Sequence, residues 1–262
     1  MRSCASSSTR RAVLSGLAAT AVGGTGRAAA PVTVLAAASL QTALDEIAGL
    51  WRVRGGALRL AYGASGALVR QLDQGAPADI LITADVDWMD AARARNLVQA
   101  HTRRVIAGNR LVLVAGPGGP ARLRIGPGFG LAAALGRGRL ATADPASVPL
   151  GRYARAALTT LGVWDEAAPR LAPADNARTA LALVARGEAP LGVVYATDAR
   201  AEPRVRILDV FPADSHPPIV YPAALTTRAS AQAAELLAFL TAAPARAVWD
   251  RLGFIRPGAV RP

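Results

Sequence analysis

The stretch that most constrains the fold runs from residue 32 to residue 51 and reads VTVLAAASLQTALDEIAGLW. It begins with Val32, Thr33 and Val34, whose β-branched side chains favour a strand. Three alanines and Ser39 follow, and apolar residues then recur at helical spacing at Leu40, Leu44, Ile47 and Trp51. The stretch predicts a buried strand, a tight turn of small residues, and a helix with a serine in its first turn.

Ser39 can act in two ways at the start of this helix. Its hydroxyl can cap the helix by accepting a hydrogen bond from an open backbone N–H group. The same helix end can instead bind an anion, because its N–H groups and the helix dipole both favour negative charge. The stretch alone leaves both roles open.

The same unit recurs twice in the next fifty residues. A strand at 58–62 leads through Gly63-Ala-Ser65-Gly66 into a helix, and a strand at 79–83 leads through Ala84-Asp85 into another. Three such repeats predict an α/β lobe with a mainly parallel sheet. Asp85 is interpreted as an ordinary helix cap.

A second α/β group follows, and the first group then resumes. Strands are predicted at 109–115, 139–143, 191–195 and 204–210, with helices that begin near Pro149 and Asn176. A further strand at 220–226 and helices at 231–240 and 244–252 complete the chain. We expect a first lobe from 31–107 and 221–262 and a second lobe from 108–220. Two chain crossings between such lobes predict a hinge and a cleft.

Residues 1–30 are predicted to be a signal peptide rather than part of either lobe. They contain four arginines and no acid, an apolar stretch, and Ala28-Ala29-Ala30 at the end, while Arg10-Arg11 indicates twin-arginine export. The only cysteine, Cys4, lies before the apolar stretch. The mature chain is therefore expected to be periplasmic, without a lipid anchor, a disulfide or a cysteine ligand.

The basic charge does not indicate a nucleic-acid-binding protein. The formal charge is +12, and removing the four arginines of the signal leaves +8. All thirty basic residues are arginines, spread along the chain with few aromatic residues between them. Without lysine there is no Walker-type phosphate loop, and two histidines, His101 and His216, are too few for a metal site.

Five positions could meet around a small anion at the carboxyl side of the two sheets, where open α/β sheets bind ligands. They are Ser39, Ser65, the Pro149-Leu150-Gly151 turn, Asn176-Ala177 and Tyr195. Hydroxyls and helix-start N–H groups would supply neutral donors from both lobes. For Tyr195 the alternative is a core tyrosine whose hydroxyl is satisfied by the protein.

The sequence around these positions resembles the periplasmic molybdate-binding proteins of ABC-type molybdate importers. The resemblance rests on Ala36-Ala-Ala-Ser39-Leu40, Gly75-Ala-Pro-Ala-Asp-Ile80, Val148-Pro-Leu-Gly151 with Tyr153, Ala189-Pro-Leu-Gly-Val-Val-Tyr195, and Phe211-Pro-Ala-Asp-Ser-His216 before Tyr221-Pro222. It covers nearly the whole mature chain, in order.

The resemblance implies a two-lobed type II periplasmic binding protein fold that takes molybdate or tungstate. Ser39, Ser65 and Tyr195 would donate hydroxyl groups, and Leu150 and Ala177 would donate backbone N–H groups. It further implies delivery to the membrane permease of an ABC importer, by a monomer without a cofactor. A carrier of sulfate or phosphate on the same fold remains an alternative.

A more remote alternative is a serine hydrolase. Gly63-Ala-Ser65-Gly-Ala67 nearly matches the nucleophile elbow, with His216 as base and Asp198 as its orienting partner. However, the last glycine of the motif is missing, and Pro217-Pro218 indicates a rigid loop beside His216.

Overall fold

The structure is a computed structural model that describes residues 30–259 and contains ten strands in that range. They are β1 (Val32–Ala37), β2 (Leu58–Gly63), β3 (Ile80–Ile82), β4 (Arg104–Gly108), β5 (Leu111–Ala115), β6 (Leu140–Ala143), β7 (Leu171–Ala174), β8 (Leu191–Tyr195), β9 (Arg206–Val210) and β10 (Val220–Leu225). The signal-peptide prediction for 1–30 lies outside the described residues, except for residue 30.

Ten α-helices surround these strands in the described part of the chain. They are α1 (Gln41–Val53), α2 (Ser65–Asp73), α3 (Val86–Ala94), α4 (Leu131–Leu135), α5 (Pro149–Thr160), α6 (Trp164–Ala167), α7 (Ala177–Ala185), α8 (Ala196–Arg200), α9 (Ala231–Phe239) and α10 (Ala243–Arg251). None of the helices among residues 30–259 has the length and hydropathy needed to cross a bilayer.

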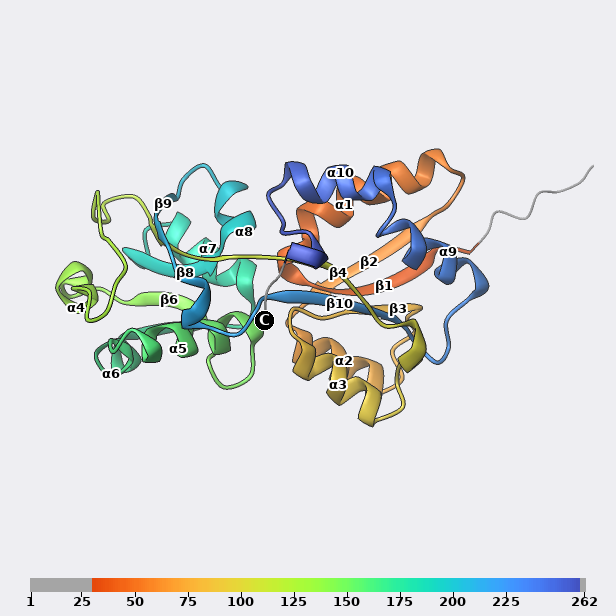
Figure 1. Ribbon diagram of the computed structural model, residues 1–262, viewed down its shortest axis with the longest axis horizontal. Coiled ribbons are helices and arrows are strands. Elements are labelled where there is room, and N and C mark those ends of the chain that lie inside the picture. Colours follow the sequence, from red (N-terminus) through yellow and green to blue (C-terminus); the bar gives the residue numbers. More distant parts are fainter. Residues whose placement is uncertain (1–29, 260–262) are drawn as a thin grey trace, which may run out of the picture.

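The chain forms two α/β lobes that lie side by side (Figure 1). The first lobe contains the sheet β2-β1-β3-β10-β4, and the second contains the sheet β7-β6-β8-β5-β9. In each sheet three parallel strands are followed by one antiparallel strand and then by an edge strand. The α/β class is therefore confirmed, but the first sheet is mixed where the sequence predicted a mainly parallel one, and the second sheet is mixed in the same way.

The predicted strands are all present, within a few residues of their expected ends, but β4 and β7 were not predicted. Both are edge strands. Pro173 lies inside β7, and an edge strand tolerates proline because one side of its backbone has no ladder partner. The short helices α4, α6 and α8 were also missed, because four or five residues carry little periodicity.

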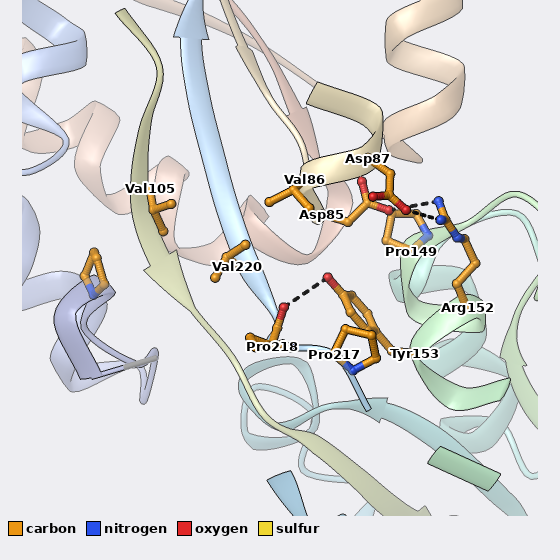
Figure 2. Close-up of a pocket in the computed structure, with 11 residues that line it drawn as sticks. Asp85, Val86, Asp87, Val105, Pro149, Arg152, Tyr153, Pro217, Pro218 and Val220 are labelled. Carbon is orange, nitrogen blue, oxygen red and sulfur yellow. Dashed lines mark hydrogen bonds and ion pairs between the residues drawn. The ribbon is translucent and has the colours of Figure 1, made fainter. Parts of the chain in front are cut away.

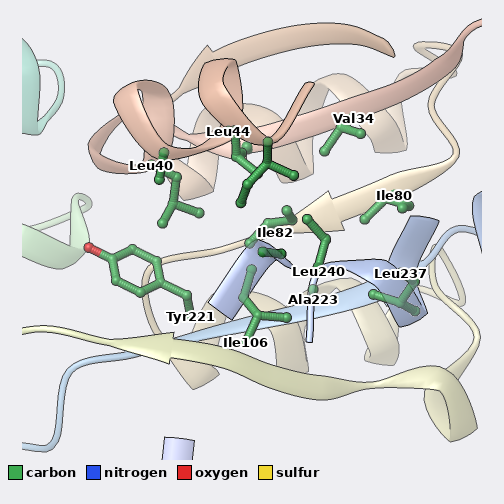
Figure 3. Close-up of a cluster of buried hydrophobic side chains, with 14 of the residues drawn as sticks. Val34, Leu40, Leu44, Ile80, Ile82, Ile106, Tyr221, Ala223, Leu237 and Leu240 are labelled. Carbon is green, nitrogen blue, oxygen red and sulfur yellow. The ribbon is translucent and has the colours of Figure 1, made fainter. Parts of the chain in front are cut away.

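Each sheet is covered by helices on both faces. In the first lobe α1, α9 and α10 pack on one face, and α2 and α3 pack on the other. Figure 3 shows the larger of these two cores, in which Leu40, just before α1, and Leu44 of α1 face Ile80 and Ile82 of β3. Tyr221 lies at the edge of this core, with its hydroxyl turned away from the aliphatic side chains.

Two chain segments connect the lobes. One runs from β4 to β5 and the other runs from β9 to β10. They lie against each other, since Asn109 N donates a hydrogen bond to Ile219 O at 3.1 Å. Paired crossings of this kind are the connection expected of the hinge predicted from the sequence.

Two glycines near the end of α1 allow a test of its packing. Gly49 lies inside the helix, and a Cβ added there would meet no atom within 4 Å, whereas a Cβ on Gly56 would overlap the indole ring of Trp51. We expect Gly49→Ala to raise the free energy of unfolding by about 0.5–1 kcal/mol, because alanine restricts the unfolded chain more than glycine does.

Gly56→Ala should lower the free energy of unfolding, because Trp51 packs on Phe239 with a centroid separation of 5.3 Å and must shift. Denaturant unfolding of both variants measures these changes. Equal effects of the two substitutions would contradict this description of α1.

Candidate functional site

The five positions expected from the sequence lie around one narrow pocket between the lobes. Ser39, Ser65, Leu150, Ala177 and Tyr195 all line it, and the empty space among its lining residues is about 220 Å³ including its solvent-facing mouth. Ser39 and Ser65 come from the first lobe, and the other three come from the second. The structure thus brings together residues as far apart in sequence as 39 and 195.

The sheet topology explains why these residues meet. Ser39 follows β1, Ser65 follows β2 and Ala84 follows β3, while Leu150 follows β6 and Ala177 follows β7. Tyr195 is the last residue of β8. The carboxyl ends of the parallel strands in the two sheets therefore face one another across the pocket, which is the edge where open α/β sheets bind ligands.

The starts of α5 and α7 supply backbone donors. Pro149 is the first residue of α5, and the first hydrogen bond of the helix runs from Arg152 N to Val148 O. The N–H of Leu150 therefore has no acceptor within its helix. In α7 the Asn176 side chain accepts a hydrogen bond from Thr179 N at 3.0 Å, and the N–H of Ala177 lies before the first helical bond.

The close approach of α5 to β6 depends on Gly151. A Cβ at this position would overlap the carbonyl oxygens of Ala143 and Asp144 at the end of β6. Only glycine allows the first turn of α5 to lie directly against the strand end, and that contact sets where the Leu150 N–H points.

Ser65 has an arrangement that leaves its hydrogen available. Ser65 is 1% exposed, and its Oγ accepts a hydrogen bond from Ala84 N at 2.9 Å. Because a backbone N–H can only donate, the Ser65 O–H hydrogen remains free to point elsewhere. Ser65 lies at the first residue of α2 and forms no cap hydrogen bond.

Ser39 does not cap α1. It lies in a 3₁₀ turn at Ala38–Leu40, the cap residue of α1 is Leu40, and no side chain caps that end. The Ser39 Oγ lies instead 3.0 Å from the hydroxyl oxygen of Tyr221. The capping interpretation of Ser39 is therefore wrong, whereas Asp85 does cap α3 by accepting from Trp88 N at 3.0 Å.

Tyr195 is a buried tyrosine with an unsatisfied hydroxyl. It is 1% exposed, and its hydroxyl has no hydrogen-bond partner within residues 30–259. The alternative of a core tyrosine with a satisfied hydroxyl is thus wrong. Buried hydroxyls are normally paired, so an unpaired one that lines a pocket indicates a site for an acceptor. Burial raises the pKa of Tyr195 well above its usual value, so the hydroxyl stays neutral and can donate.

The charged residues lie around the pocket rather than in it. None of the pocket-lining residues in the described chain is Arg, Asp or Glu. Arg152 of α5 contacts Asp85 at 3.3 Å and also Asp87, across the lobes, and Figure 2 shows these pairs beside the contact of Tyr153 with Pro218. Arg178 of α7 donates to Thr42 Oγ1 of the first lobe at 2.6 Å. These contacts hold the two rims together.

The residues required by a serine hydrolase make separate contacts. Asp198 is fully buried, and its nearest charged partner is Arg178, whose Nε lies 2.9 Å from Asp198 Oδ1. The ring of His216 bonds to Pro217 O through Nδ1 at 2.8 Å and packs edge-on to Tyr153. With Ser65 bonded to Ala84, no residue of the proposed triad activates another.

Within residues 30–259 no group of three or more His, Cys, Asp or Glu side chains could hold a metal ion. Donors that are neutral N–H and O–H groups favour an anion instead.

Sequence reasoning missed two buried polar residues next to the site. Asn109 is 4% exposed and Tyr221 is fully buried, and the Asn109 Nδ2 donates to the Tyr221 hydroxyl at 3.0 Å. Asn109 had only marked the start of a strand. The available signal was a polar amide just before an apolar strand, at the junction between the two predicted lobes.

The buried cap of α3 should make stability depend on pH. Burial raises the pKa of Asp85 to about 6. The folded protein therefore holds a proton that the unfolded chain releases above its ordinary pKa of about 4. Between about pH 4 and pH 6 the unfolded state binds fewer protons, so this group makes stability fall as pH rises.

We expect Asp85→Asn to remove this pH-dependent part of the free energy of unfolding, because asparagine does not titrate. Asparagine can still cap the helix. Relative to the wild type, the variant should gain stability on going from pH 4 to pH 7, on the order of 2 kcal/mol. Thermal or denaturant unfolding at both pH values gives the comparison, with Asp73→Asn on the surface as control. A pH-independent difference between Asp85→Asn and the wild type would contradict the expectation.

The sequence matches known proteins along most of its length. A model of the bacterial extracellular solute-binding protein family matches residues 32–255. The molybdate-binding protein ModA of Escherichia coli is 40% identical over 226 residues, which covers 85% of this chain and 88% of that protein. The ModA protein of Haemophilus influenzae is 39% identical over 235 residues, covering 87% and 91% of the two chains.

Solved structures share the fold. The Azotobacter vinelandii periplasmic molybdate-binding protein superposes with a TM-score of 0.75 at 24% identity, covering 86% of this chain and 99% of that one. The sulfate-binding protein SubI of Mycobacterium tuberculosis gives a TM-score of 0.70 at 17% identity, covering 87% and 88%. The predicted periplasmic binding protein fold is therefore confirmed, and the chain belongs to the family of bacterial extracellular solute-binding proteins.

Proposed function

We propose that this protein captures molybdate or tungstate in the pocket between its lobes and delivers the ion to the membrane permease of an ABC importer. Two relatives at 39–40% identity are molybdate-binding proteins, and the match covers most of each chain. The protein is a solute-binding protein and not an enzyme. The ligand is held without a cofactor.

The observation that carries this proposal is the Tyr195 hydroxyl, buried and without a partner in the described chain, beside open helix-start N–H groups. Ser39, Ser65 and Tyr195 would donate O–H groups to the oxyanion, and Leu150 and Ala177 would donate N–H groups. Hydrogen bonds to a charged acceptor contribute about 1.5–3 kcal/mol each, so five or more offset the loss of the ion's hydration. The donors are neutral, so no counter-charge has to be buried with the ion.

Selectivity would come from the size of the pocket. Molybdate and tungstate are larger than sulfate but present the same four oxygens. Donors fixed on helix starts and strand ends hold their separations, and a smaller ion cannot reach all of them at once. The fold by itself does not choose between these ions, because the sulfate-binding protein SubI shares it. A sulfate or phosphate carrier is thus the second candidate.

Capture would involve closure of the lobes. We assign 31–107 with 221–262 to one moving lobe and 108–220 to the other, with bending at the two crossings. Cross-lobe contacts of Arg152 with Asp85 and of Arg178 with Thr42 would stabilise the closed form. The protein would act as a monomer in the periplasm, after export through the signal at 1–30.

Calorimetric titration of the mature protein with molybdate, tungstate, sulfate and phosphate tests the ligand. We expect molybdate and tungstate to bind at least about a hundredfold more tightly than sulfate or phosphate, a difference of about 2.7 kcal/mol. Binding of sulfate or phosphate in preference would support the second candidate, and ester hydrolysis that Ser65→Ala abolishes would support an enzyme instead.

Substitutions in the pocket test the site. Ser39→Ala and Tyr195→Phe should each weaken molybdate binding by at least about tenfold, or about 1.4 kcal/mol, because each removes one donor to the ion. The melting temperature of Tyr195→Phe should change little, since the hydroxyl that it removes has no partner within residues 30–259. Ser39→Ala should still fold but melt somewhat lower, because it leaves the buried Tyr221 hydroxyl without its acceptor.

Two matched controls remove a hydroxyl outside the pocket. Tyr62→Phe removes the bond to Asp45 at 2.6 Å, and Ser230→Ala changes an exposed serine that caps nothing. Both should leave the affinity for molybdate unchanged. An unchanged affinity in Ser39→Ala or Tyr195→Phe would remove that residue from the site.

A further inference from the structure

A chain of buried polar side chains leads from the lobe crossings to Ser39. The Nδ2 of Asn109 donates to the Tyr221 hydroxyl at 3.0 Å, and that hydroxyl lies 3.0 Å from Ser39 Oγ. All three residues are 4% exposed or less. Asn109 lies in the first crossing between β4 and β5, and Tyr221 lies in β10 just after the second crossing.

The direction of the Asn109 amide is fixed by its neighbours. Its Oδ1 accepts a hydrogen bond from Arg110 N at 2.9 Å, and a backbone N–H can act only as a donor. The opposite side of the amide must therefore be the NH₂ group. That group donates both of its hydrogens, one to Tyr221 and one to Thr197 Oγ1 at 2.9 Å.

The direction of the Tyr221 hydroxyl follows. Its oxygen already accepts from Asn109, and burial raises the pKa of Tyr221, so the hydroxyl keeps its hydrogen. The Ser39 Oγ is the only acceptor near that hydroxyl among the contacts of the described chain. If Ser39 donated to Tyr221 instead, the buried Tyr221 hydrogen would be left without an acceptor, which is unfavourable for a buried polar group.

Ser39 is therefore an acceptor toward Tyr221, and its own hydrogen is left over. Ser39 lines the pocket with Tyr195, so an acceptor there can take that hydrogen. A hydroxyl that accepts one hydrogen bond becomes a better donor in the next, because chained hydrogen bonds polarise each other.

We propose that Asn109 and Tyr221 are positioning residues that orient the Ser39 hydroxyl so that it donates into the pocket. The chain of donors then runs from Asn109 to Tyr221, from Tyr221 to Ser39, and from Ser39 to an oxygen of the bound oxyanion. This inference rests on the proposed function of the pocket. It adds two positioning residues that do not touch the ligand.

The position of Asn109 ties this series of hydrogen bonds to the present arrangement of the lobes. Thr197 belongs to α8 of the second lobe, whereas Tyr221 belongs to the first-lobe sheet. The amide is satisfied on both sides only while the lobes hold their present relation. Opening that separates Thr197 from Tyr221 would release the amide, and with it the fixed direction of Ser39.

A double-mutant cycle on molybdate affinity tests the inference. Tyr221→Phe removes only the hydroxyl and keeps the ring contacts with Phe254 and Tyr195, whose centroids lie 5.8 and 6.2 Å away. In the wild-type background it should weaken binding about fivefold, since Ser39 loses its polarising partner. In the Ser39→Ala background the same change should alter affinity less than about twofold, because no hydroxyl remains to be oriented.

The matched control is Tyr153→Phe. Tyr153 is also buried and also reaches across the lobes, since its hydroxyl donates to Ala84 O at 3.3 Å. Any effect of Tyr153→Phe on affinity should be the same with and without the Ser39 hydroxyl. A general effect of removing a tyrosine hydroxyl between the lobes is thereby separated from orientation of Ser39.

The outcomes separate this inference from the proposed function. Equal losses from Tyr221→Phe in both backgrounds overturn the inference while molybdate binding by the wild type stands. No binding of molybdate by the wild type overturns the proposed function and the inference together. Should Tyr221→Phe fail to fold, Asn109→Ala takes its place in the same cycle. A loss of affinity that disappears in the Ser39→Ala background supports orientation of Ser39 by Asn109 and Tyr221. An equal loss in both backgrounds refutes it.

Discussion

The structure depends on one electrostatic constraint: a narrow pocket between the lobes that is lined by neutral donors and by no charged side chain of the described residues. A buried charge is costly unless hydrogen bonds replace its hydration. The two sheets meet this requirement by presenting the carboxyl ends of their parallel strands to each other, so that helix starts and hydroxyls converge from both sides. Cationic side chains are kept at the rims, where Arg152 and Arg178 connect the lobes.

The strand order, the position of Gly151 and the lobe crossings all help to bring these donors to one pocket. The repeated order of three parallel strands, one antiparallel strand and one edge strand gives the lobes equivalent edges. Gly151 lets α5 begin against the end of β6, which brings the Leu150 N–H to the pocket. The two crossings join the lobes beside this edge, so the hinge and the pocket share neighbouring residues such as Asn109 and Tyr221.

Much of the fold and the pocket could be predicted from local sequence. Strand, small-residue turn and helix recur with clear periodicity, and Ser39 and Ser65 stand at the start of such helices. The edge strands β4 and β7 were missed because an edge needs no continuous apolar pattern. The role of Ser39 as a partner of Tyr221 was missed because the two residues are 182 positions apart. Which polar groups find partners depends on packing between distant segments, and so the unpaired hydroxyl of Tyr195 became evident only in three dimensions.

The uncharged lining of the pocket has a consequence for unloading. Among the described residues none that faces the pocket changes its charge near neutral pH, so acidification at a membrane surface has no group there to titrate. A tightly held ion could then leave only when its donors are pulled apart mechanically. The energy for discharge would then come from separation of the two halves, transmitted through the two connecting segments. Protonation of Asp85, whose pKa is raised to about 6, weakens its contact with Arg152 across the lobes but leaves the donors to the ion unchanged.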